Sequence, residues 1–314
     1  MTGTPMPSFD EAARQHALDR YHILDTLPEA AYDDIVQLAS QLCGTPTALI
    51  TLIDRDRQWF KARTGFDDTQ TSRSVAVCDH AIRAPGQLME IEDLAQDPRF
   101  ASNPYVSGDI GSARFYAGMP LTTPEGAAIG TVCVVDDQPR TLDERQRTAL
   151  QSLARLTMTL LEARARERAL EHETFVATTV PAPATPEGQA PDRYLLALME
   201  LQDLAGATER LGERTTEKLL QRLDEALEGA LPDGGRDAIN RTSGSAEYVA
   251  MLHGPEAART LDRLRALLDA QGDTHGLLFL IGVADADTAE TPGAVFMRAD
   301  ADLLQRRTES LSTP

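Results

Sequence analysis

Apolar and polar positions along the chain form blocks of two kinds, some alternating as in strands and others spaced as in helices. The most informative block is residues 114–136, where two apolar runs flank a Thr-Thr-Pro-Glu-Gly turn. Pro124 and Gly126 favour the turn, and residues 128–135 are rich in β-branched side chains and nearly free of charge, as expected of a strand buried on both faces. The pattern predicts a long central hairpin on which earlier segments pack.

Helices are predicted at the start of the chain from apolar residues spaced three and four apart. Residues 8–24 form the first such stretch. A second helix is expected directly afterwards, with Thr26 as its N-cap, Pro28 in its first turn and Glu29 returning a hydrogen bond to the cap. Its apolar stripe ends before Gly44, so this helix should cover one face of the sheet.

Shorter elements are expected between these helices and the central hairpin. Two β runs, 47–53 and 58–63, are separated by a polar turn and predict a second hairpin. A short helix is expected over 74–82, a strand over 88–91 and a long loop over 97–109. The central hairpin would then complete the sheet.

A long helix is predicted after the central hairpin, with Thr141 as its cap and Glu144 reaching back to it. Its leucines lie close to a heptad seam, at Leu142, Leu150, Leu153, Leu156 and Leu160. Two interpretations are open, because such a seam serves either a helix that pairs with its copy in a dimer or a helix that packs on its own sheet.

Residues 173–191 are dominated by Thr, Ala and Pro, which is typical of a semi-rigid linker. We therefore expect a first domain over 8–172 and a second over 192–314. The second domain should contain a strand at 194–201, a helix at 215–228, a hairpin around Gly244, a helix at 256–270, a strand at 277–283 and a helix at 294–310. Alternating elements imply a sheet with helices packed on it, so the fold class is α/β (α+β).

Charge and hydropathy exclude several classes of function. The 314 residues carry a formal net charge of −19, which argues against binding nucleic acid or an anionic membrane. The most hydrophobic segment, 276–284, is too short to span a bilayer, and no signal-peptide pattern opens the chain. A cytoplasmic protein is expected. Cys43, Cys78 and Cys133 lie far apart without metal-ligand spacing, so buried reduced thiols are expected.

Several blocks of the first domain resemble GAF sensory domains of bacterial signalling proteins. The blocks are ILDT at 23–26, DRQWFK at 56–61, VCDHAI at 77–82, DPRF at 97–100, RFYAG at 114–118 and GTVCV at 130–134. The resemblance covers roughly residues 12–171. It implies an antiparallel sheet with helices that binds a small ligand or holds a dimer together, with no common catalytic reaction.

A ligand pocket is expected between this sheet and its covering loops, because small-molecule sites combine an aromatic wall with a few polar groups. The candidates taken from the GAF-like blocks are Trp59, Phe60, Cys78, His80, Arg114 and Tyr116. Each has an alternative without a ligand. Trp59 and Tyr116 could be core aromatics, His80 an exposed helix residue, and Arg114 the partner of a nearby aspartate.

The second domain resembles the GGDEF domain of diguanylate cyclases, in which two facing domains each hold one GTP. The resemblance implies carboxylates that hold magnesium against the phosphates and a glycine hairpin that approaches the nucleotide. Gly244, Ser245, Ala246, Glu247 and Tyr248 stand where the signature Gly-Gly-Asp-Glu-Phe would be. By the same resemblance, the residues implied for metal binding are Glu200 and Glu247, and those implied for nucleotide binding are Gly212, Glu217 and Gly244.

The departures from this signature guide the functional hypothesis. Ala246 replaces the signature acid by a methyl group, and Ser245 adds a side chain where bare backbone would approach phosphate. Losing one preorganised electrostatic contact costs ~10²–10³ in rate, and a metal ligand at least as much. No catalytic residues are therefore expected.

We hypothesise a non-catalytic bacterial signalling protein with a GAF sensor or dimerisation module and a degenerate GGDEF-like domain. The second domain would act by binding a guanine nucleotide or a protein partner, with Mg²⁺ as cofactor only if nucleotide binding is retained. A homodimer through the helices that flank the GAF domain is the expected assembly. The alternative is an active diguanylate cyclase that makes cyclic di-GMP, with Glu200 and Glu247 reconstituting a metal site.

Overall fold

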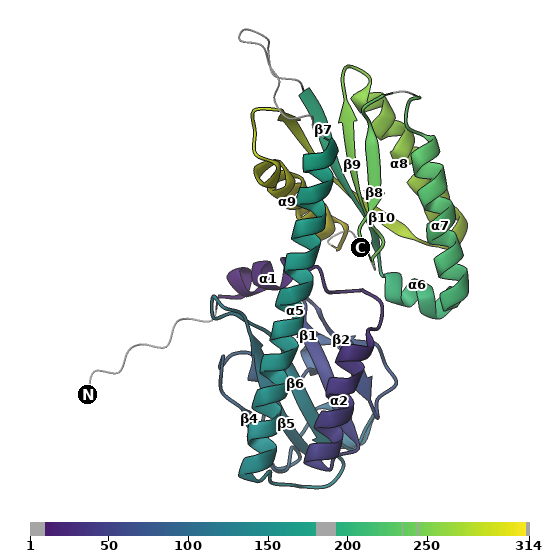
Figure 1. The fold of residues 1–314 in the computed structure, drawn as a ribbon. Coiled ribbons are helices and arrows are strands. Elements are labelled where there is room, and N and C mark those ends of the chain that lie inside the picture. The colour runs from purple at the N-terminus through teal and green to yellow at the C-terminus, as the bar shows by residue number, and fades with distance from the viewer. Residues whose placement is uncertain (1–9, 180–192, 234, 244, 312–314) are drawn as a thin grey trace, which may run out of the picture. The chain divides into compact units, whose positions relative to one another are not determined.

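The computed structural model describes residues 10–179, 193–233, 235–243 and 245–311 (Figure 1). The chain divides into two compact units, one made of Met1–Leu24 and Pro28–Ala165 and the other of Asp25–Leu27 and Arg166–Pro314. Each unit combines an antiparallel sheet with helices. The mixed fold class predicted from the sequence is therefore confirmed.

The first unit is built on six strands, β1 (Thr47–Ile53), β2 (Arg57–Thr64), β3 (Gln70–Ser72), β4 (Met89–Ile91), β5 (Phe115–Thr122) and β6 (Ala128–Asp136). They pair antiparallel in the order β3-β2-β1-β6-β5-β4. The predicted central hairpin is β5 with β6. Strand β6 lies between β1 and β5, and its charge-free stretch is buried almost throughout.

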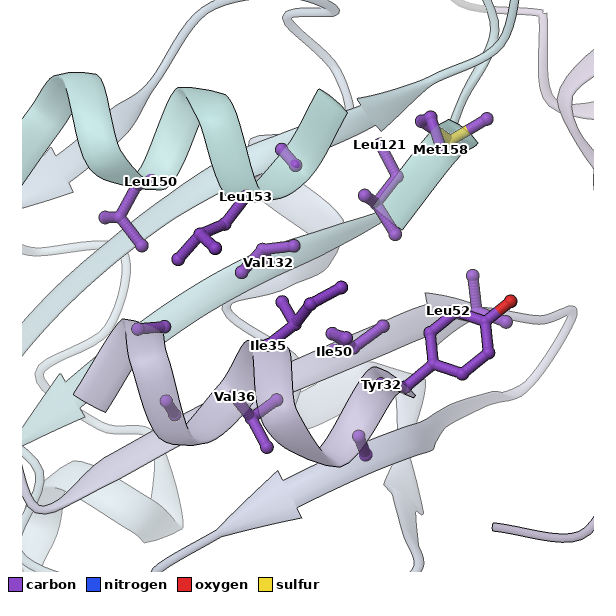
Figure 2. Packing of buried hydrophobic residues seen from close by; sticks show 14 of the residues in the cluster. Tyr32, Ile35, Val36, Ile50, Leu52, Leu121, Val132, Leu150, Leu153 and Met158 are labelled. Carbon is purple, nitrogen blue, oxygen red and sulfur yellow. The ribbon is translucent and has the colours of Figure 1, made fainter. Parts of the chain in front are cut away.

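Helices of the first unit are α1 (Glu11–Asp19), α2 (Ala30–Cys43), the 3₁₀ turn η1 (Arg73–Val75), α3 (Cys78–Ala81), α4 (Pro104–Ser107) and α5 (Glu144–Thr179). Helices α2 and α5 cover one face of the sheet (Figure 1). Figure 2 shows Ile35 and Val36 of α2 and Leu150 and Leu153 of α5 gathered around Val132 of β6. The opposite face packs a second apolar cluster that includes residues of α3 and α4.

The starts of α2 and α5 differ from the predicted caps. Glu29, not Thr26, is the N-cap of α2 and makes no side-chain cap bond, because its carboxylate accepts hydrogen bonds from Lys61 and Arg164 at 2.7 and 2.9 Å. Burial lowers the pKa of Lys61 to about 8, although Glu29 opposes the shift. The predicted cap of α2 was wrong, because the helix begins only at Ala30 and the Glu29 carboxylate is hydrogen-bonded to Lys61 and Arg164 instead.

The start of α5 lies beyond the predicted Thr141–Glu144 box. Asp143 and Gln146 form the reciprocal pair instead, each side chain accepting from the other residue's backbone amide at 2.8 and 2.9 Å. The type of cap was predicted correctly, but its position was wrong by two residues.

Three further segments of the first unit differ from the predictions. Residues 74–82 are not one helix, because the extended backbone of Ala76 separates η1 from α3. The predicted loop 97–109 contains α4, which Asn103 caps through the Tyr105 amide. Helix α1 ends at Asp19, before His22, whose φ of 44° is incompatible with helix.

The predicted leucine seam of α5 divides between two environments. Leu142, Leu150 and Leu153 are buried in the core of their own unit, which accounts for them without a partner. Leu156 is 45% exposed. Leu160 is partly buried against the same core. Packing on the α5 helix's own sheet is thus observed for every seam residue except Leu156, and pairing with a second copy stays a prediction.

The second unit contains β7 (Arg193–Gln202), β8 (Ala238–Arg241), β9 (Glu247–His253) and β10 (Leu278–Asp287), paired antiparallel in the order β10-β7-β9-β8. Its helices are α6 (Leu204–Leu211), α7 (Glu213–Gly229), α8 (Ala257–His275) and α9 (Pro292–Leu311). One sheet face packs against α9 and Val176 of α5, and the other against α7 and α8. Helix α6 was not predicted; Asp203 caps it by accepting from the Gly206 amide at 2.9 Å.

The predicted linker is shorter than expected at its start. Residues 173–179 continue α5, and residues 180–191 lie outside the described part of the chain, as do residues 8 and 9 and Gly244. The hairpin predicted around Gly244 is present as the β8–β9 pair. Within the described ranges, no helix has the length and apolarity needed to cross a membrane.

Candidate functional site

A cavity of about 350 Å³ lies in the first unit, between the sheet face opposite α2 and α5 and the segments that cover it. Its inner wall includes Phe60 of β2, Tyr116 of β5 and Cys133 of β6. Ser112 and Asp137, which are both exposed, stand at its outer part. The lining is mostly apolar with a few polar groups, which is the composition of a small-molecule site.

Two cysteines meet in the inner wall of this cavity. The Sγ atoms of Cys78, at the start of α3, and Cys133, on β6, lie 3.7 Å apart. The Gln58 amide donates to Cys78 Sγ at 3.2 Å, and the Tyr116 hydroxyl donates to it at 3.3 Å. Both thiols are buried, as the sequence predicts, but their proximity to each other gives them a shared chemistry that isolated thiols lack.

The two thiols of this pair differ in acidity. Burial raises the pKa of Cys78, but hydrogen bonds from Cys133, Thr131 and Tyr116 outweigh it and lower the pKa below the ordinary thiol value. The hydrogen bond with Cys78 and burial raise the pKa of Cys133 well above the ordinary thiol value. Cys78 is therefore the thiol of the pair that loses its proton first.

The structure brings some of the predicted ligand residues together and separates others. Phe60, Cys78 and Tyr116 line the cavity. Trp59 is buried in the core under α2 and α5, because neighbouring residues of a strand point to opposite faces of the sheet. It therefore adopts the core alternative.

His80 and Arg114 do not line the cavity. His80 is exposed and its ring lies 4.8 Å from that of Phe100. The guanidinium of Arg114 donates to the backbone carbonyls of Val106 and Ala113 at 2.8 and 3.1 Å, rather than to Asp93 or Asp97. Sequence reasoning missed Gln58 and Cys133 as cavity residues. Only the alternation along β2 and β6 hinted at which side they face.

In the second unit, the two predicted metal ligands face each other. Glu200 of β7 and Glu247 of β9 occupy paired positions in the sheet. Each carboxylate is held by an arginine of the same unit: Arg307 of α9 donates to Glu200 at 2.9 Å, and Arg168 of α5 makes a bidentate pair with Glu247 through its Nε, at 2.7 Å, and its Nη2. Glu247 is only 5% exposed.

A buried polar cluster surrounds the Arg168–Glu247 pair. His172 of α5 shares a 2.9 Å hydrogen bond with Thr242, and its ring lies 4.4 Å from that of Phe296 of α9. Burial lowers the pKa of Arg168, but the charge of Glu247 outweighs burial and raises it. The guanidinium therefore stays charged beside its carboxylate.

The remaining signature positions are also occupied by structural contacts. Ala246 packs in an apolar cluster with Leu201, Leu204 and Leu219. The Ser245 hydroxyl donates to the Thr242 carbonyl at 3.0 Å. The Tyr248 hydroxyl donates to Asp224 at 2.8 Å. Burial and this bond raise the pKa of Tyr248.

Two of the three predicted nucleotide residues, Gly212 and Glu217, lie in the described part of the chain. Gly212 links α6 to α7 with a φ of 85°, Glu217 is exposed on α7, and Gly244 lies outside the described residues. A second cavity, of about 370 Å³, lies between α7 and the β8–β9 pair, but neither Gly212 nor Glu217 lines it. In the part of the chain that the structure describes, no three His, Cys, Asp or Glu side chains gather as a metal site would require.

Comparison with known proteins supports the assignment of the first unit. The family model of the GAF domain matches residues 27–161, so this unit contains a GAF domain. A cyclic di-GMP phosphodiesterase of Pseudomonas aeruginosa is 42% identical over 159 residues, which cover 50% of this chain and 27% of the phosphodiesterase. The chain thus matches about a quarter of that relative's length.

Solved structures that resemble parts of the chain include three of different function. A type II free methionine-R-sulfoxide reductase from Thermoplasma acidophilum is 13% identical, covering 46% of this chain and 96% of that chain, with a TM-score of 0.36. A GAF sensor protein from Burkholderia vietnamiensis is 16% identical, with coverages of 50% and 99% and a TM-score of 0.36. A microbial GGDEF domain studied with cyclic di-GMP is 24% identical, with coverages of 46% and 87% and a TM-score of 0.37.

Proposed function

We propose that the chain is a bacterial signalling protein whose GAF domain senses a small molecule and whose second unit is a degenerate GGDEF-like domain. The second unit acts by binding a guanine nucleotide or a protein partner, without turnover. The cyclic di-GMP phosphodiesterase that shares the 159-residue match supports a place in cyclic di-GMP signalling. The cavity beside Cys78 is the proposed sensor site.

The observation that carries this proposal is the pairing of both candidate metal ligands with arginines. A magnesium ion prefers carboxylate oxygens that are available to it, whereas Glu200 and Glu247 are bonded to Arg307 and Arg168. Displacing a buried guanidinium would leave an uncompensated buried charge, which is costly. Ala246 offers no carboxylate to replace them, and its apolar surroundings would not favour one.

Cofactor and assembly follow from the same proposal. Mg²⁺ would accompany the second unit only together with a bound nucleotide, with phosphate oxygens and waters supplying most of its ligands. We also propose a homodimer through α5 and the neighbouring α2, because Leu156 on α5 and Leu38 and Leu42 on α2 are exposed leucines of the first unit.

Two calorimetric titrations of the full chain test the function, one with GTP and one with cyclic di-GMP, both in the presence of Mg²⁺. The mixtures are then analysed by chromatography. We expect no conversion of GTP to cyclic di-GMP. Heat of binding that is lost in Glu217→Ala but kept in Arg222→Ala, a control exposed elsewhere on α7, would identify a nucleotide receptor.

The other outcomes of this titration are equally informative. Absence of heat with both nucleotides would leave a protein as the partner of the second unit. Formation of cyclic di-GMP by the wild-type chain would contradict the proposal and support the alternative, an active diguanylate cyclase that uses Glu200 and Glu247.

A further inference from the structure

We propose that Cys78 and Cys133 are a redox-sensing thiol pair, and that a small hydroperoxide entering the cavity converts them to a disulfide. This inference specifies the kind of signal that the sensor cavity detects, and in that respect it rests on the proposed function. It concerns only residues of the first unit, so it can fail or succeed independently of nucleotide binding by the second.

The two sulfurs of the pair are in van der Waals contact. The sulfurs are 3.7 Å apart, whereas an S–S bond is about 2.05 Å long. One of the two segments that carry the cysteines must therefore move toward the other for the bond to form. Cys78 lies at the start of α3, which is only four residues long and is preceded by the extended Ala76. Cys133 lies on the central strand β6. We expect α3 to move toward the sheet.

The surroundings of Cys78 favour it as the attacking sulfur. It accepts hydrogen bonds from the Gln58 amide and the Tyr116 hydroxyl, and such donors stabilise a thiolate relative to a thiol. Cys133 lies at a distance suited to donate its thiol proton or, later, to resolve an oxidised Cys78. Nucleophile and resolving thiol adjacent to each other are what a reversible thiol sensor requires.

The cavity gives a small oxidant a route to these buried sulfurs. Cys78 and Cys133 line its inner wall, while the exposed Ser112 and Asp137 line its outer part. Cys43 does not line this cavity and is buried in the core under α2 and α5. Burial and the charge of Asp143 also raise the pKa of Cys43 to about 11, so it serves as an internal unreactive reference.

The proposed reaction consumes one hydroperoxide and two thiols. The Cys78 thiolate attacks the terminal peroxide oxygen, the O–O bond breaks, and the departing alkoxide or hydroxide takes the Cys133 thiol proton. Cys78 is then a sulfenic acid. The Cys133 thiolate attacks Cys78 Sγ, the S–O bond breaks, and the hydroxide leaves as water after taking a proton from solvent. Overall, two thiols are oxidised to a disulfide, and the hydroperoxide is reduced to one alcohol and one water. For hydrogen peroxide the products are two waters.

The decisive experiment uses the wild-type full chain and hydrogen peroxide. After quenching with catalase, the protein is denatured in N-ethylmaleimide, digested without reductant and mapped by mass spectrometry. We expect a peptide pair linked through Cys78 and Cys133 that dithiothreitol separates, with Cys43 alkylated throughout. Recovery of Cys78 and Cys133 as alkylated thiols, at a peroxide dose that oxidises free cysteine, would overturn the proposal. Oxidation of Cys43 as fast as Cys78 would do the same.

Substitutions then assign the two roles. In Cys133→Ser, Cys78 should stop at the sulfenic acid and be trapped by dimedone. In Cys78→Ser, Cys133 should remain an alkylatable thiol, and Cys43→Ser should form the disulfide as wild type does. Equal peroxide reactivity of Cys133 with and without Cys78 would refute the assigned order. The wild-type map decides the central claim even if a buried substitution prevents folding.

The pH dependence of the oxidation rate supplies a readout that burial alone would not produce. Hydrogen bonds to Cys78 hold its pKa below that of an ordinary thiol despite burial, so the rate, which follows the thiolate fraction, should level off at a lower pH than for an ordinary thiol. An ordinary thiol, with a pKa of about 8.5, would still gain rate between pH 7 and 8. A rate that keeps rising through that interval would exclude Cys78 as a preformed thiolate nucleophile.

Discussion

At the scale of single residues, two carboxylates of the second unit are paired with arginines, Glu247 with Arg168 and Glu200 with Arg307. Glu247 is almost fully buried and accepts a bidentate pair of hydrogen bonds from Arg168. A buried pair of this kind adds little net stability over apolar residues of the same shape, yet loss of one partner is expensive. The contribution of this pair to stability is best tested by substituting one of its two residues and then both.

Arg168→Met should reduce the free energy of unfolding of the second unit by about 3–5 kcal/mol, because Glu247 would be left buried without its cation. Adding Glu247→Gln should recover a large part of this loss, since the remaining charge is removed. Arg259→Ala, which removes an exposed pair with Glu256, is the control and should cost about 1 kcal/mol or less. Urea unfolding followed by hydrogen exchange of β9 measures all of them; a double variant no more stable than Arg168→Met would contradict this account.

At the scale of elements, helix α9 packs unusually close to strand β10, and a glycine makes this approach feasible. A Cβ at Gly282 would lie 2.2 Å from the Ala299 carbonyl oxygen and 2.5 Å from the Leu303 nitrogen, both in the backbone of α9. Real Cβ atoms are not found so close to backbone. The spacing between helix and sheet in the second unit therefore depends on one residue that has no side chain.

Gly282→Ala should destabilise the second unit by about 1–3 kcal/mol, because α9 must move away from the sheet to admit the methyl group. A methyl group on Gly293, in the first turn of α9, would have no neighbouring atom within 4 Å. Gly293→Ala is therefore the matched control and should be neutral or stabilising by about 0.5–1 kcal/mol. Equal thermal unfolding midpoints for the two variants would show that the close approach is not a constraint.

At the scale of the whole molecule, a boundary between the two units falls within α5, between Ala165 and Arg166. The helix carries core residues of the first unit on one side, including Leu150 and Leu153. Leu156 is left 45% exposed on the same helix. A single exposed leucine is ordinary, but with Leu38 and Leu42 on α2 it adds to the apolar surface of the first unit.

Sedimentation of the full chain should show a dimer that Leu156→Asp dissociates, because a buried carboxylate would meet its own copy across a two-fold interface. Arg155→Asp is the control. Arg155 is exposed on the same helix but directed about 100° away around its axis, so its substitution should leave the dimer intact. A wild-type monomer at micromolar concentration would exclude the proposed homodimer.

Local patterns in the amino-acid sequence were sufficient to predict several elements. The charge-free run of β6 and the turn at Pro124 and Gly126 predicted the central hairpin correctly, since a strand buried on both faces must be apolar along its length. The blocks of the first unit also predicted its GAF domain. The cap of α5 was predicted by type but misplaced by two residues. The cap of α2 was predicted wrongly, because Lys61 and Arg164, which are distant in sequence, bond the Glu29 carboxylate.

Only the tertiary structure shows which reactive or charged side chains lie close together. Cys78 and Cys133 are separated by 55 positions, and nothing in their spacing indicates that α3 places them 3.7 Å apart. In the same way, Ala246 was readable from the sequence, but the pairing of Glu247 with Arg168 was not, because the two residues lie 79 positions apart. Local composition fixes how a segment folds, whereas contacts between distant segments fix what its functional groups can do.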